Sequence, residues 1–228
     1  MKALLWKDFR INIPILIAAV VVWCIVQPLA ILNVVLSNGR GDVPLVIWAV
    51  ALTLTNLASL TFSQLLVGAL AANAFAAERS DRSAEFLFAL PPARGRILLS
   101  KLIVALGLAA GLWLAHLFIL EIVIPIVGNS PPLDRSTRTE TYQMTFAAAV
   151  CLFGGSWLGS SLLKSAAYSL LAGIALLGAT GGAILNFQVL LKLPHSEALE
   201  AAYKGSFLLL GLVSFIAGTI YYLRRVEP

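Results

Sequence analysis

The charged and polar side chains that could do chemistry gather in one segment of this chain, residues 78–101. Glu78, Arg79 and Glu85 stand near its start, and Lys101 ends it. Apolar residues and two prolines separate these groups, and no catalytic constellation is visible among them. A charged start, an apolar middle and a basic end are typical of a short helix that rests on a membrane or binds another protein.

Outside that segment, candidate ligands and acids are isolated in the sequence. His116 and His195 have no motif partner, and Cys24 and Cys151 lie in apolar stretches without a metal-ligand spacing. We expect His116 to be a hydrogen-bonded helix residue. Glu121 is the only acid inside a span, so it is either a polar site within the membrane or a residue at the membrane boundary. The sequence predicts no catalytic residue, no metal site and no cofactor.

The chain also lacks the glycine-rich loop that holds nucleotide phosphates. Its nearest approach, Gly-Gly-Ser-Trp-Leu-Gly-Ser-Ser at residues 154–161, has serine where the loop needs lysine, and it lies in an apolar stretch. We therefore do not expect this chain to hydrolyse ATP alone, and it is not predicted to be an enzyme.

The elements that must position these residues are membrane-spanning helices. The 228 residues are 60% hydrophobic and 12% charged, which is too little polar surface for a water-soluble globule. About 20 residues of helix cross the hydrocarbon core, and the apolar runs lack the alternation of barrel strands. We predict an all-α, polytopic protein with six transmembrane helices in a single transmembrane domain, residues 1–228. Six stretches hold no Asp, Glu, Lys or Arg: 11–39, 43–77, 102–120, 141–163, 165–191 and 205–223.

Basic residues predict that both chain ends lie in the cytoplasm. With the N-terminus inside and six spans, the inner segments hold eleven Lys and Arg residues and the outer segments hold five. The positive-inside rule favours this orientation. Membrane topology therefore explains the net charge of +5, and we expect lipid rather than nucleic acid as a partner.

The second half of the chain must turn back on itself. Residues 141–191 hold one charge, Lys164, and as a single helix they would be about 76 Å long. We predict a turn at residues 159–164, with Lys164 at the cytoplasmic surface. Near Gly182, glycines loosen the helix. Either the fifth span ends there and residues 183–199 form an outer re-entrant piece, or one long tilted helix continues.

Small residues recur four positions apart, a spacing that allows helices to approach closely. We expect these pairs to pack helices within the subunit rather than to form a dimer seam. The pairs are Gly107/Gly111, Gly155/Gly159 and Gly178/Gly182.

The segment after the second span is predicted to hold a short helix. Ser83 can cap it, and Pro91 ends it. Phe86 and Leu87 give it an apolar surface, which either rests on lipid or fills a groove on another protein. Basic residues then mark the return of the chain to the anionic membrane surface: Arg94, Arg96 and Lys101.

This segment resembles ABC-2 type transporter permeases. The matching positions are Glu78, Arg79, Ser83, Glu85, Leu87, Leu90, Pro91, Arg94 and Lys101. Residues 1–10 are similar to that family's opening amphipathic segment, in which Lys2, Lys7 and Arg10 would bind anionic headgroups. The chain departs from the pattern at Arg82, where glycine is usual, at Ser83, which replaces threonine, and at Pro92, which doubles the proline.

The resemblance implies a permease subunit without catalytic residues of its own. In that family the loop at residues 78–96 carries a coupling helix that docks on a separate ATP-binding cassette ATPase subunit. Two permease units, identical or different, and two ATPase units form an exporter, here expected in the cell membrane, as in a bacterial inner membrane. The alternatives are an ion-coupled secondary transporter and a non-enzymatic membrane scaffold. The implied ATPase contacts are Glu78, Arg79, Ser83, Glu85, Phe86, Leu87, Leu90, Pro91 and Arg94.

Overall fold

A computed structural model of the chain describes residues 2–37, 45–80, 94–128, 134–192 and 196–225. Within these ranges the chain is built almost entirely from helices. The elements are α1 (Lys2–Ser37), α2 (Leu45–Ser80), α4 (Arg94–Phe118), the π-helical turn η1 (Ile119–Val123), α5 (Ile124–Gly128), α6 (Arg135–Leu162), α7 (Ala166–Leu190) and α8 (Glu197–Arg225).

Five helical runs in the described part of the chain are long and apolar enough to cross a membrane. The prediction of an all-α, multi-pass membrane protein is confirmed at this level. In addition, α1 is a continuous helix of 36 residues. The five runs are Val50–Arg79, Gly95–Ile126, Ser136–Leu162, Ala166–Leu190 and Glu197–Arg224.

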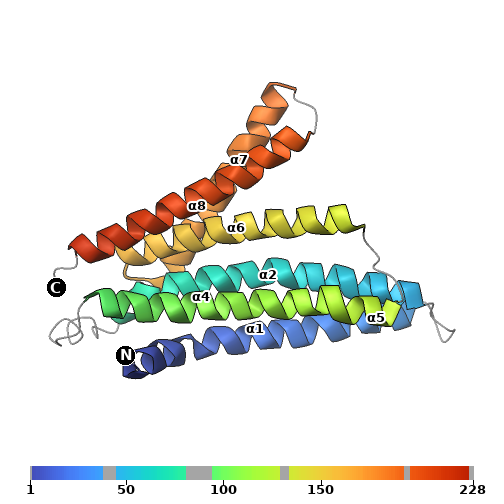
Figure 1. Cartoon of the computed structure of the whole chain (residues 1–228), viewed down its shortest axis with the longest axis horizontal. Helices are drawn as coiled ribbons and strands as arrows, with labels where there is room; N and C mark the ends of the chain where they lie inside the picture. The colour runs from blue at the N-terminus through green and yellow to red at the C-terminus, as the bar shows by residue number, and fades with distance from the viewer. Residues whose placement is uncertain (1, 38–44, 81–93, 129–133, 193–195, 226–228) are drawn as a thin grey trace.

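The helix α2 is the centre of the bundle, where it contacts α1, α4, α5, α6 and α7. Figure 1 shows α1, α4 and α5 along one side of α2 and α6 along the other, while α7 and α8 form a hairpin that tilts away from the rest. The start of α1, the end of α2, the start of α4 and the end of α8 lie at one end of the bundle, here called the proximal end (Figure 1). The opposite end, where α5 ends and α6 begins, is the distal end.

An aromatic cluster joins α2, α6 and α8 in the proximal half. The ring of Phe75 lies 4.8 Å from that of Trp157 and 4.2 Å from that of Tyr222, measured between centroids. Trp157 is fully buried, and its indole N–H donates to Thr219 Oγ1 at 3.2 Å. Gly211 of α8 also touches α6 so closely that a side chain at Gly154 would overlap its carbonyl oxygen.

The turn between α6 and α7 lies later than the sequence predicts. Residues 159–161 are the buried last turn of α6, and the connection is Leu163–Ser165, with Lys164 exposed. The prediction of a turn at Lys164 is confirmed, but its extension back to Gly159 is wrong. Gly159 stays helical because it faces Ser169 of α7 at close range, which a turn at that point would prevent.

The re-entrant piece after Gly182 is also not observed. Helix α7 continues through Gly182 to Leu190, and Glu197 already belongs to α8, so the alternative of one long helix is confirmed over the described residues. A glycine lowers helix stability by only about 1 kcal/mol. Breaking the helix in lipid would leave several backbone groups unpaired at a larger cost, and the helix therefore continues.

One of the three predicted glycine pairs packs helices together. Gly155 and Gly159 both face α7, at Gly173 and Ser169 respectively. At the other two pairs, Gly107/Gly111 and Gly178/Gly182, a Cβ added to the glycine would meet no atom of another described helix within 4 Å, so their predicted role in close packing within the subunit is wrong.

Candidate functional site

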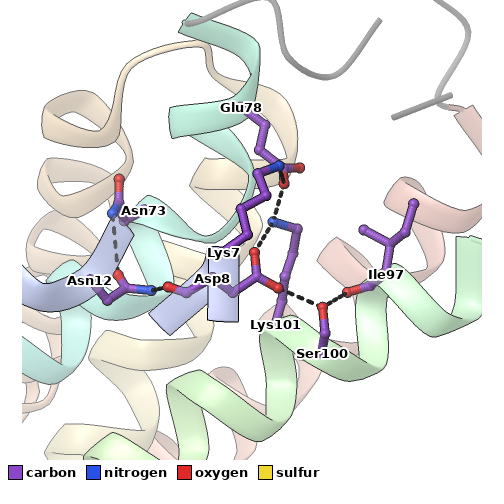
Figure 2. A network of polar contacts seen from close by, with 8 residues as sticks. All are labelled: Lys7, Asp8, Asn12, Asn73, Glu78, Ile97, Ser100 and Lys101. Carbon is purple, nitrogen blue, oxygen red and sulfur yellow. Dashed lines mark hydrogen bonds and ion pairs between the residues drawn. The ribbon is translucent and has the colours of Figure 1, made fainter. Parts of the chain in front are cut away.

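Four charged side chains from three helices meet at the proximal end (Figure 2). Lys101 Nζ of α4 lies 2.8 Å from Glu78 Oε1 of α2 and 3.3 Å from Asp8 Oδ1 of α1. Lys7 Nζ of α1 lies 2.7 Å from the same Glu78 oxygen. Two cations thus balance two anions, and we call these four residues the buried ion cluster.

Burial makes this cluster costly to disturb. The side chains of Lys101, Asp8 and Glu78 are 3%, 6% and 7% exposed, and that of Lys7 is 31% exposed. Charges removed from water require partners, and removal of one partner leaves the other charge uncompensated. Lys101 is the residue that contacts both acids, so the cluster depends on it most.

Neutral polar groups extend the cluster along α1. Ser100 Oγ donates to the Asp8 carboxylate and lies 2.9 Å from Ile97 O. Asn12 Nδ2 donates to the Asp8 carbonyl at 2.8 Å, and Asn73 Nδ2 donates to Asn12 Oδ1 at 3.2 Å (Figure 2). The first turns of α1 are therefore held to both α2 and α4.

The position of these residues along the helices explains why they meet. Glu78 lies in the last turn of α2, and Lys101 lies in the second full turn of α4. The two residues therefore stand on either side of residues 81–93 and join the helices that enter and leave this segment. Lys101 Nζ also lies 5.8 Å above the centroid of the Phe75 ring, which connects the ion cluster to the aromatic core.

Arg79 makes a second connection from the end of α2. Its guanidinium donates to Ser161 O at 2.5 Å. Ser161 belongs to the last turn of α6, where backbone carbonyls lack helical partners, so Arg79 acts as a cap for that helix. Through Glu78 and Arg79 together, the end of α2 is attached to α1, α4 and α6.

Two lysines occupy different surroundings from those the sequence suggests. Lys101 is not exposed but is buried between helices, where two acids compensate its charge. Lys7 bonds to Glu78 rather than being free for lipid headgroups. Trp6 beside it is exposed, as expected for an amphipathic segment. The clue available in the sequence was Asp8, a single acid within a basic N-terminal segment.

The predicted ATPase contacts divide into two groups. Glu78 and Arg79 contact this chain's own helices, and Arg94 opens α4. The remaining six lie outside the described residues: Ser83, Glu85, Phe86, Leu87, Leu90 and Pro91.

Comparison of the chain with protein-family models, with curated proteins and with solved structures finds no match.

At the distal end, Glu121 forms a partly exposed ion pair, in which the Arg138 side chain is 14% exposed. Its carboxylate lies 3.0 Å from Arg138 Nη1 and accepts a hydrogen bond from the Tyr142 hydroxyl at 2.9 Å. Pro125 has no N–H to donate to the carbonyl of Glu121, and Ile124 N–H bonds to the carbonyl five residues back, which produces the π-helical turn η1. The Glu121 side chain is 46% exposed and pairs with Arg138. This pairing is compatible with both roles that the sequence allows, a polar site within the membrane and a residue at the membrane boundary.

His116 is a hydrogen-bonded helix residue, as predicted. It is 4% exposed, and its Nδ1 lies 3.0 Å from Asn56 Oδ1 while its Nε2 lies 2.7 Å from Ser63 Oγ. Asn56 Nδ2 in turn donates to the His116 carbonyl. Over the described residues, no group of three or more His, Cys, Asp or Glu side chains is placed to hold a metal ion.

Proposed function

We propose that this chain is the permease subunit of an ATP-driven ABC-2 type transporter. In this proposal α1 is the first of six spans and both ends of the chain are cytoplasmic. The segment between α2 and α4 carries a coupling helix that binds a separate ATP-binding cassette ATPase subunit. A second permease unit, identical or related, completes the exporter.

The observation that carries the proposal is the buried 2.8 Å ion pair between Glu78 and Lys101. These residues border residues 81–93, the segment whose sequence resembles the coupling loop of such permeases. A coupling helix can transmit force only if the helices on either side of it move with it. The ion pair supplies that connection at the point where it is needed.

The mechanism follows from the contacts at the proximal end. Closure of the ATPase pair on binding ATP would displace the coupling helix. The ion cluster would then move α1, α2 and α4 together, and the bond from Arg79 would draw the end of α6 with them. Removing one partner from a buried ion pair costs about 3–5 kcal/mol, so the helix ends resist separation under load.

The distribution of exposed basic residues supports a cytoplasmic proximal end. Lys2, Lys164 and Arg224 are exposed at or near this end. Basic residues accumulate on the cytoplasmic side of membrane proteins. The same surface would face an ATPase subunit.

The proposal is tested by purifying the tagged chain from its native membranes in mild detergent. We expect a protein with the phosphate-loop pattern G-x-x-x-x-G-K-[ST] to co-purify. The double substitution Phe86→Glu/Leu87→Glu should abolish that co-purification, because charges would replace the apolar anchors of the helix. The spans should stay folded, as shown by an unchanged elution volume and thermal transition.

The substitution Leu133→Glu serves as the matched control. Leu133 is an apolar residue that lies between α5 and α6 in the sequence, outside the segment for which an ATPase contact is proposed. The control should co-purify with the ATPase as the unmodified chain does. Equal ATPase recovery with the double variant would contradict the proposal, and transport that needs an ion gradient but no ATPase would favour a secondary transporter instead.

A further inference from the structure

A second feature of the bundle lies at mid-depth and does not touch the buried ion cluster. A cavity of about 270 Å³ opens between α1, α2 and α4. Its lining residues fall within residues 19–24, 59–66 and 112–116, close to the middle of the spans of α2 and α4. None of the described residues that line it is Asp, Glu, Lys or Arg, so a charged molecule would find no compensating group among them.

One buried hydroxyl in this lining has no partner. Ser59 is 2% exposed, and its Oγ makes no hydrogen bond with any described residue. Hydroxyls in membrane helices usually bond to the carbonyl four residues back, as Thr55, Thr61 and Ser63 of the same helix do at 2.6, 3.0 and 2.8 Å. Ser59 therefore differs from its neighbours, and an unpaired buried hydroxyl is costly unless something bonds to it.

The other polar groups of the cavity are already occupied. Both ring nitrogens of His116 contact protein oxygens, on Asn56 and Ser63. The Cys24 thiol is only a weak hydrogen-bonding group. Among the described lining residues, Ser59 therefore carries the strong hydrogen-bonding group that remains for a ligand. Its Oγ has almost no accessible surface in this structure, so the side chain must rotate about χ1 for a ligand oxygen to reach it. The rest of the wall is mainly apolar.

We propose that this cavity binds a small, uncharged, mainly apolar molecule whose single oxygen bonds to Ser59. A dry protein cavity of about 150 Å³ holds benzene, so this larger space accommodates an aromatic ring with several further atoms. The site stands apart from the proposed function, because neither the coupling segment nor an ATPase is needed to form it.

A pair of photoreactive probes tests the site on the purified chain in lipid nanodiscs, without any ATPase subunit. The first probe is 4-[3-(trifluoromethyl)diazirin-3-yl]benzyl alcohol, and the second is the same aryl diazirine without the hydroxymethyl group. We expect the alcohol to label peptides containing residues 19–24, 59–66 or 112–116 saturably, with competition by benzyl alcohol. The hydroxyl-free probe should label these peptides more weakly than the alcohol does.

Three variants separate the site from general lipid exposure. Ser59→Ala removes a hydroxyl that has no internal partner, so the fold should persist while affinity for the alcohol falls about fivefold, the value of one hydrogen bond. Ala115→Phe fills the cavity from an exposed position and should abolish saturable labelling. Thr61→Ala is the matched control, because Thr61 is exposed on the same helix and bonds to its own backbone.

Each result of the labelling experiment either supports the proposed site or overturns it. Saturable labelling that is weakened by Ser59→Ala, lost in Ala115→Phe and retained in Thr61→Ala supports the proposal. Labelling that does not saturate, as expected if water or bulk lipid alone fills the cavity, overturns it. Saturable labelling that is unchanged by either Ser59→Ala or Ala115→Phe also overturns it, since the probe would then bind elsewhere or without Ser59.

Discussion

The two ends of the bundle each hold an ion pair between helices, but in different surroundings. At the proximal end, Glu78 and Lys101 are 7% and 3% exposed, and each has a further ion-pair partner on α1, Lys7 and Asp8 respectively. At the distal end, Glu121 is 46% exposed and pairs with Arg138, which is 14% exposed, and one tyrosine assists the pair. The same chemistry is thus part of a buried cluster at one end and a single, partly exposed pair at the other.

This difference shows which end holds its helices in a fixed relation. A buried pair strongly penalises the loss of one partner, whereas a pair in which solvent reaches one of the charges loses less when the contact is broken. In the distal pair solvent reaches the Glu121 carboxylate, while Arg138 is 14% exposed. The proximal end, with three side chains that are at most 7% exposed, is therefore better suited to transmit displacement between helices.

The largest expected effect is at Lys101. Replacing it with methionine leaves Glu78 paired with Lys7 and removes the lysine that pairs with the buried Asp8. We expect the free energy of unfolding to fall by about 3–5 kcal/mol. Chemical unfolding of the purified chain in detergent, followed by circular dichroism or tryptophan fluorescence, measures the change.

Lys204→Met provides the comparison for that experiment. Lys204 lies 3.8 Å from Glu200 on the same helix, in a partly exposed pair, so its loss should cost less than about 1 kcal/mol. Equal destabilisation by the two lysine variants would remove the proposed difference between buried and exposed pairs.

A smaller effect is expected at Arg79, the second connection of the proximal end. Arg79→Gln removes the donor to Ser161 O and should lower stability by about 1–3 kcal/mol. Because the bond caps α6, hydrogen exchange should rise most in the last turn of that helix. Arg224→Gln, at an exposed position of α8, should change neither quantity. Unchanged exchange in α6 would show that the Arg79 contact does not hold the helix end.

The smallest effect is expected at the distal end. Glu121→Gln removes the charge from the pair with Arg138 while the amide oxygen can still accept the Tyr142 hydroxyl. The free energy of unfolding should change by about 1 kcal/mol or less. A loss as large as that of Lys101→Met would mean that Glu121 is a buried intramembrane charge, and the comparison between the ends would fail.

The sequence predicts the helices well, because charge-free stretches of spanning length are a direct consequence of the lipid environment. It places the turns less well. The sequence predicts a turn at Gly159, but in the structure this glycine packs closely against Ser169. Gly182 suggests the end of a helix, but it lies within the continuous helix α7. The identity of a small residue does not show whether it faces another helix.

The candidate site was predicted only in part. Glu78 and Arg79 stand out in the sequence, but the sequence predicts Lys7 and Lys101 to be flanking charges at the membrane surface and assigns no role to Asp8. Their grouping depends on three helix ends that are far apart in the chain, and spacing along one segment cannot reveal it. Two acids and two lysines at neighbouring span ends, with charges that balance, are the sequence signal that indicates such a cluster.

The central claim is tested most directly by lysine-reactive cross-linking of the tagged chain in its native membranes, followed by mass spectrometry. Lys164, beside the α6–α7 turn at the proximal end, and Lys192, after α7, are both exposed, so they report on opposite ends of that helix. We predict cross-links from Lys164, and from Lys2, to a protein with a phosphate-binding loop, and none from Lys192. Cross-links to such a protein from Lys192 alone, or none from any lysine, would contradict the account.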